Sequence, residues 1–146
     1  MIDHRLIREN PDLIIQALNR RGLDVDLSDL KKDCDELKAL EKLRNDLQSN
    51  GNLIGKEVGQ KIKNGIAPNS TEISLLREKG NSIKKEVIKI EEKEKSLSQK
   101  IKEELLGLPN LPSESCPFGK NESENIELRS WGNPIKSENL KEHWQI

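Results

Sequence analysis

The sequence has almost no aromatic residues. Only Phe118, Trp131 and Trp144 occur in 146 residues, and hydrophobic residues of all kinds make up 32%, against about 45–50% in a typical globular domain. The first 117 residues therefore contain no large ring with which to fill a thick core. Leu, Ile and Val are present there at regular spacing, which favours a thin seam between helices over a compact globule.

Net charge, cysteine clusters and long apolar runs are also missing. A net charge of −1 creates no overall attraction to nucleic acid or membrane. Cys34 and Cys116 stand far apart without clustered histidines, so we expect neither a disulfide framework nor a metal site, and interpret both as small apolar side chains in a reducing compartment. Because no segment has the length of a signal peptide or a membrane span, we predict a cytoplasmic protein with no membrane partner.

A short amphipathic helix is predicted between Pro11 and Gly22. Pro11 suits the first helical position, Asn10 can cap the helix, and Gly22 can take the left-handed conformation that ends it. Arg20 and Arg21 fall in the last turn, where the helix dipole favours cations. The apolar residues share one face at helical spacing: Leu13, Ile14, Ala17 and Leu18.

A long helix is predicted to begin near Ser28 or Asp29 and to end at Lys63. Its apolar residues follow alternate steps of three and four, the pattern of a helix-packing seam. They are Leu37, Leu40, Leu47, Ile54 and Val58. Arg44 and Gly51 are the two poor members of this ladder.

A second long helix is predicted after the capping residues Asn69, Ser70 and Thr71. From residue 73 to residue 108, strict three–four spacing places eight aliphatic residues among eleven positions. The positions are Ile73, Leu76, Gly80, Ile83, Val87, Ile90, Glu94, Leu97, Ile101, Glu104 and Leu108. Such a pattern over five heptads indicates a coiled coil, not disorder.

The stretch between the long helices, NGIAPNST at 64–71, is neutral, and its Gly65 and Pro68 forbid a continuous helix. A break of about eight residues allows only a tight reversal. We therefore predict an all-α fold whose antiparallel coiled-coil hairpin covers about 29–106, is roughly 50 Å long and has its tip at 64–71. With the first short helix it forms a helical arm over residues 1–108.

The pattern changes after the second long helix. Pro109, Pro112 and Pro117 impose extended or turn backbone. Residues 126–131 then alternate in polarity as a strand does, although a lone strand is not stable by itself. We interpret 109–146 as an extended Pro-rich linker, an isolated strand-like tail and the start of a domain whose body is missing.

No catalytic constellation is found. The sequence contains no nucleophile elbow, P-loop, Rossmann glycine pattern or zinc motif. His4 and His143 lie at opposite ends, with no acid or cysteine placed for a triad. We therefore predict no catalytic residue, no metal ligand and no cofactor site in this chain.

Positive charge gathers in the outer half of the predicted hairpin. Between residues 56 and 85, seven cations stand against three acids. The cations are Lys56, Lys61, Lys63, Arg77, Lys79, Lys84 and Lys85. A solvated coiled-coil face is the default explanation, yet the concentration at the outer end equally favours contacts with phosphates. Because no aromatic is nearby to stack on an unpaired base, we expect a folded or helical RNA recognised through its shape and backbone.

Gly51, Gly55 and Gly59 recur at four-residue spacing on the first long helix, each at a cost near 1 kcal/mol relative to Ala. Bare backbone there permits a close approach by the partner helix or by a ligand's phosphates. Alternatively, the glycines are a tolerated soft spot. The sequence leaves both interpretations open.

Several segments resemble bacterial-type seryl-tRNA synthetases. IRENPDLIIQALNRRG is similar to the opening of these enzymes, and the hairpin resembles their tRNA-binding arm. More specifically, LPNLPSESCPFGKNESENIELRSWG is similar to the segment joining the arm to the catalytic domain, a P-N-x-P, S-x-P-x-G and N-x-E pattern ending in Trp-Gly. HWQI resembles the first residues of that domain. Cys116, where the family usually has an aliphatic residue or Thr, is a mild departure.

The resemblance implies a class II ligase that charges tRNA(Ser) with serine, using ATP and Mg²⁺. It also implies that the arm holds the long variable arm and the elbow of tRNA(Ser), and that a homodimer forms through the catalytic domain. The class II motifs do not occur in these residues. We therefore expect this chain alone to be monomeric and to bind tRNA(Ser) without catalysing its charging.

The residues also allow an alternative, a helical-hairpin module that binds proteins as a chaperone arm or an assembly scaffold. Such modules usually have an apolar tip, whereas Ile66 is the only candidate anchor here. A free-standing regulator related to the synthetase is a third hypothesis.

Overall fold

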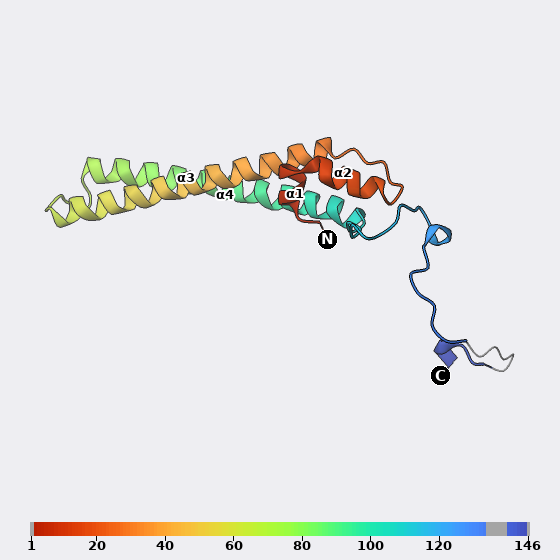
Figure 1. Cartoon of the computed structure of the whole chain (residues 1–146). Helices are drawn as coiled ribbons and strands as arrows, with labels where there is room; N and C mark the ends of the chain where they lie inside the picture. The colour runs from red at the N-terminus through yellow and green to blue at the C-terminus, as the bar shows by residue number, and fades with distance from the viewer. Residues whose placement is uncertain (1, 134–139, 146) are drawn as a thin grey trace.

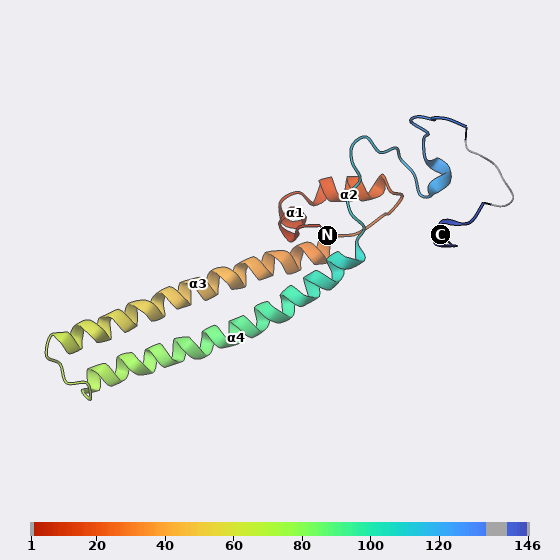
Figure 2. The same ribbon diagram turned by 90° about the horizontal axis from the view of Figure 1, so that it is seen from below.

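The computed structural model describes residues 2–133 and 140–145, which form helices and no strands (Figure 1). The two long helices are α3 (Ser28–Lys63) and α4 (Thr71–Gly107). They lie side by side and antiparallel in both views (Figures 1 and 2). This confirms the predicted all-α hairpin, which at 36 and 37 residues per helix is about 55 Å long.

Two short helices, α1 (His4–Glu9) and α2 (Pro11–Asn19), lie against the base of the hairpin (Figure 2). α1 was not predicted from the sequence; it is capped by Asp3 through a 2.8 Å hydrogen bond from the Arg5 N–H to Oδ1. α2 begins at its proline as predicted, although the Asn10 side chain makes no capping hydrogen bond. Gly22, with φ of +71°, takes the expected left-handed conformation.

The tip of the hairpin is a turn with defined hydrogen bonds. Gly65 has φ of +90°, and the Ile66 N–H donates to the Lys61 carbonyl at 3.1 Å, as in a Schellman motif. α4 then begins at the predicted cap, where the Ser70 hydroxyl accepts a 3.3 Å hydrogen bond from the Ile73 N–H. The tip therefore reverses the chain without leaving these end groups of the helices unpaired.

The core lies at the base, where α1 and α2 pack against the hairpin. Its buried members are Ile2, Ile7, Ile14, Leu18, Leu27, Leu30, Cys34, Leu37, Ile101 and Leu105. Burial raises the pKa of the Cys34 thiol. Beyond this base, the two long helices pack along the predicted seam, and Lys61 on α3 pairs with Glu72 on α4 near the tip. On α4 the seam differs from the prediction at one step, because Leu105 is buried in the core while Glu104 is exposed.

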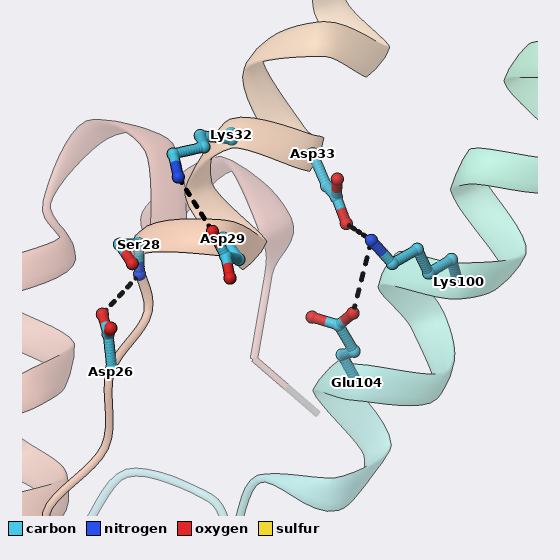
Figure 3. A network of polar contacts seen from close by, with 7 residues as sticks. All are labelled: Asp26, Ser28, Asp29, Lys32, Asp33, Lys100 and Glu104. Atoms are coloured by element: carbon cyan, nitrogen blue, oxygen red, sulfur yellow. Dashed lines mark hydrogen bonds and ion pairs between the residues drawn. The ribbon is translucent and has the colours of Figure 1, made fainter.

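Polar contacts at the base connect the two long helices (Figure 3). The Lys100 Nζ lies 2.5 Å from Asp33 Oδ2 on α3 and 3.9 Å from Glu104 Oε1. The hydrogen bond to Asp33 raises the pKa of Lys100. At the start of α3, Asp26 Oδ1 accepts a 2.9 Å hydrogen bond from the Ser28 N–H. That bond lowers the pKa of Asp26.

The tail differs from the expectation. Residues 126–131 form no strand, and Ile126, Leu128 and Trp131 are 66%, 94% and 92% exposed. Within the described residues, no neighbouring strand is present to pair with their backbone groups, and for this reason the predicted strand does not form. Among the described residues after 107, the helical segments are the single turns η1 (Glu122–Glu124) and η2 (His143–Gln145). The prediction for 109–146 also included residues 134–139 and 146, which lie outside the described residues.

Candidate nucleic-acid interface

The seven cations predicted to bind RNA lie on the outer half of α3 and α4. Six of them are exposed and one, Lys61, is half-buried. They do not share one surface, because the hairpin has two broad sides separated by the seam. The contacts of each cation, or its position on the helix, show on which side of the hairpin it lies.

Two adjoining grooves open along one side of the outer hairpin. One is lined by Leu47, Gln48, Gly51, Asn52, Gly80, Ile83, Lys84 and Val87. The other is lined by Gly51, Ile54, Gly55, Val58, Leu76, Arg77, Gly80 and Asn81. We call this side the groove face. It brings Arg77 and Lys84 together, and no acidic residue in the described part of the chain lines either groove.

Gly51 and Gly80 are the cause of the grooves. A Cβ added to Gly51 would lie 3.6 Å from the Ile83 Cγ2, and one added to Gly80 would lie 3.7 Å from the Ile54 Cγ2. These are ordinary van der Waals distances, so the glycines do not allow an unusually close approach of the helices. Each leaves the seam one side chain short. A Cβ at Gly55 would meet nothing within 4 Å.

The opposite side of the hairpin carries ion pairs, and we call it the ion-pair face. The Lys61 Nζ lies 3.6 Å from Glu57 Oε1 and also forms a hydrogen bond with Glu72 on α4. The bond to Glu72 raises the pKa of Lys61. Glu57 follows the groove residue Gly55 by two positions, a rotation of about 200° that carries it across the seam. Lys61 is therefore already neutralised within the protein.

The remaining four candidates lie away from the grooves. Lys79 follows Glu72 by two helical turns and so lies on the ion-pair face. Lys56 and Lys85 each follow a seam residue by two positions, which points them outward, about 200° from the seam. Lys63 follows the half-buried Lys61 by two positions and points outward for the same reason. Within the described residues none of these four makes an ion pair.

Along the groove face, the sign of the charge changes towards the base. A third groove on this side is lined by Leu37, Glu41, Glu91, Glu94, Lys95 and Ser98. Glu41 precedes Gln48, and Glu91 follows Lys84, by two turns each, which places them on the same side of the hairpin. The outer two grooves are thus cationic and the inner one is acidic.

The structure gives Arg20 and Arg21 a role that the sequence analysis missed. Arg20 Nη2 donates to the carbonyl of Glu114 at 2.9 Å and to that of Cys116. Arg21 Nη1 donates to the Asn110 carbonyl at 2.6 Å. The two side chains therefore fix the Pro-rich linker against the end of α2. The prediction that they lie in the last turn of the helix was wrong, because α2 ends at Asn19 and Arg20 is its C-cap. No local pattern identifies a carbonyl about ninety residues away.

Two further expectations need correction. Both cysteines are free, but Cys116 is exposed and so is not a packed apolar side chain. Ile66 at the tip is half-buried, which weakens its candidacy as an anchor for a protein partner. Across residues 2–133 and 140–145, no group of three or more His, Cys, Asp or Glu residues could hold a metal ion. None of the described helices is both long enough and apolar enough to cross a membrane.

Comparisons with known proteins agree on one family. The family model for the seryl-tRNA synthetase N-terminal domain matches residues 1–112. The serine–tRNA ligases of Prochlorococcus marinus (strain SARG) and Synechococcus sp. (strain RCC307) are 55% and 51% identical over all 146 residues. The chain spans 34% of the length of each of these relatives.

A solved structure shows the same likeness. The crystal structure of seryl-tRNA synthetase from Pyrococcus horikoshii complexed with ATP matches 90% of this chain with a TM-score of 0.61 and 33% identity. The match covers 29% of that chain.

Proposed function

Because the chain belongs to the seryl-tRNA synthetase family, we propose that its hairpin is the arm that holds tRNA(Ser) for serylation by the catalytic part of the enzyme. The observation that carries the proposal is the acid-free, cation-lined outer half of the groove face, on an arm about 55 Å long. A polyanionic backbone fits such a surface. The long variable arm and the elbow of tRNA(Ser) are the proposed contacts.

The cations of the outer hairpin attract the RNA in this proposal, by direct phosphate contacts or by longer-range charge. They are Lys56, Lys61, Lys63, Arg77, Lys79, Lys84 and Lys85. Lys61 contributes least, since Glu57 and Glu72 already neutralise it. Chemistry on the serine and on the acceptor end would occur elsewhere, with the arm acting by positioning the RNA.

The same proposal assigns residues 1–108 to the arm and 109–146 to the linker and the start of the catalytic domain. ATP and Mg²⁺ would act in that catalytic domain, and the homodimer would form through it. The described residues of this chain provide no cluster for a metal. We propose a cytoplasmic enzyme, with this chain monomeric when isolated.

Gel-shift titration of the 146-residue chain tests the proposal. The probes are a tRNA(Ser) transcript and a tRNA with a short variable arm, each at low and at moderate salt. We expect tighter binding of tRNA(Ser) because only it presents the long variable arm. Equal binding of the two probes, or no binding at low salt, would contradict the proposal.

A further inference from the structure

We infer that the RNA docks on the groove face of the hairpin, with one strand of an A-form helix lying over the two outer grooves. The inference rests on the proposed function and adds the surface and the mode of contact. It also divides the candidate cations into those that touch the RNA and those that act only at a distance.

Charge separates the two sides of the hairpin. On the groove face, Arg77 and Lys84 lie two helical turns apart, about 10.5 Å, and no ion pair within the described residues occupies either of them. On the ion-pair face, Glu57 and Glu72 hold Lys61 and would repel a phosphate. A polyanion therefore binds the groove face without first breaking an ion pair or desolvating a carboxylate.

Shape favours the same side. Where Gly51, Gly55 and Gly80 line the grooves, no side chain projects outward, so a sugar–phosphate strand can approach the helix backbone. The uncharged lining residues Gln48, Asn52 and Asn81 carry amide groups that can both donate and accept hydrogen bonds. Such groups suit the ribose 2′-hydroxyls that an A-form helix displays in its wide, shallow minor groove.

The acidic inner groove sets the limit of the docked strand. Glu41 and Glu91 line it about two turns closer to the base than Gln48 and Lys84, beside Glu94, which pairs with Arg44. An RNA strand that continued along the groove face would meet these carboxylates. The contact is therefore confined to the outer half of the arm.

Charge reversal on the two sides tests the surface. One double variant, Arg77→Glu with Lys84→Glu, alters the groove face. Its matched partner, Lys79→Glu with Lys85→Glu, makes the same change in net charge on the same helix but off the grooves. We expect the groove pair to weaken binding of the tRNA(Ser) transcript by at least about tenfold more than the matched pair, which acts only through screened, longer-range repulsion.

A second comparison tests the shape without changing charge. Gly55→Leu fills open space in the outer groove, whereas Ser49→Leu adds the same side chain at an exposed position that lines no groove. We expect Gly55→Leu to weaken binding several-fold and Ser49→Leu to leave it within about twofold of wild type. Circular dichroism at 222 nm and melting curves establish that each variant is folded before its affinity is compared.

The outcomes separate the inference from the proposed function. If wild type prefers tRNA(Ser) but the two charge-reversed pairs lose affinity equally, the docking surface is wrong and the proposed function stands. If only Gly55→Leu is without effect, the strand does not enter the groove and the inference fails in that part. If wild type shows no preference for tRNA(Ser), the proposed function itself fails.

Discussion

Arg44 and Glu94 face each other across the seam of the hairpin, with Arg44 Nε donating to Glu94 Oε1 at 3.1 Å. Their side chains are 30% and 14% exposed, so the pair is largely shielded from solvent. Each is a charged residue at a position of the apolar ladder of its own helix. The two irregularities therefore compensate each other, and they fix the register of α3 against α4 because only one alignment joins them.

Removing one partner of this ion pair should lower the free energy of unfolding more than replacing both partners with leucine. We expect Arg44→Leu alone to lower the free energy of unfolding by about 1–2 kcal/mol, because it leaves the Glu94 carboxylate shielded and unpaired. The double variant with Glu94→Leu should return to within about 1 kcal/mol of wild type, since two leucines continue the seam. Urea unfolding followed at 222 nm measures both. Additive losses in the double variant would show that the pair does not act as a unit.

The seam glycines should be replaceable with a gain in stability. Gly51→Ala and Gly80→Ala each place a Cβ at ordinary contact distance from an isoleucine. We expect each to raise the free energy of unfolding by about 0.5–1 kcal/mol, chiefly through helix propensity. Gly65→Ala is the contrasting control, because φ of +90° strains any side chain and the variant should be less stable. A loss at both seam positions in the same unfolding assay would contradict this account of the grooves.

Removing cations near the tip should change the salt dependence of RNA binding. We expect replacing Lys56, Lys63, Lys84 and Lys85 together with Gln to weaken binding of tRNA(Ser) and to flatten the plot of log affinity against log salt, because fewer counterions are released. A matched variant replaces four exposed lysines nearer the base, Lys38, Lys42, Lys95 and Lys102. If both variants changed the slope equally, net charge and not the outer hairpin would govern binding.

The carboxylate at the start of α3 should contribute to the acid limb of the stability curve. The Ser28 N–H holds the pKa of Asp26 below its ordinary value of 3.8. A lowered pKa stabilises the fold above the ordinary value, and this stabilisation is lost as the pH falls through the lowered one. Asp26→Asn should therefore melt below wild type at pH 7, and the difference should shrink as the pH is lowered from about 4 to 2. A difference that persists undiminished at pH 2 would exclude the charge as its cause.

The linker should loosen when its arginine is removed. Arg20 binds two linker carbonyls and lies 5.6 Å from the centre of the Phe118 ring. Arg20→Ala should therefore speed trypsin cleavage after Lys120 several-fold, because proteolysis follows local opening. Arg5→Ala, which removes a tryptic site on α1, is the matched control. Equal cleavage rates in the two variants would mean that these contacts do not hold the linker.

The hairpin was predictable because its information is local and repeats. Three–four spacing locates each seam, and Gly65 with Pro68 locates the turn. The register was not predictable: whether Arg44 meets Glu94, or Gly51 meets Ile83, depends on the number of residues in the turn and on the conformation of each. The groove face and the ion-pair face follow from that register. The sequence therefore identified seven candidate cations but did not assign each of them to a face.

Elsewhere the missing information is long-range. The alternation over residues 126–131 describes a strand, but a strand forms only beside another strand, and none lies in the described part of the chain. Arg20 finds its partners across a separation of more than ninety residues. α1 has six residues, too few to show a helical period, and is held by the core at the base.

Because the core lies at one end, the arm is held at its base and its tip is unsupported. Its buried cluster clamps α3 and α4 at the base, while the outer half is two helices thick and is thinned further at Gly51 and Gly80. A rotation of about 5° at the clamp would carry the tip through about 5 Å over the length of the hairpin. A flexure at the glycine layer would move only the outermost turns. The base thus sets where the arm points, and the glycine layer lets its end adjust to what it meets.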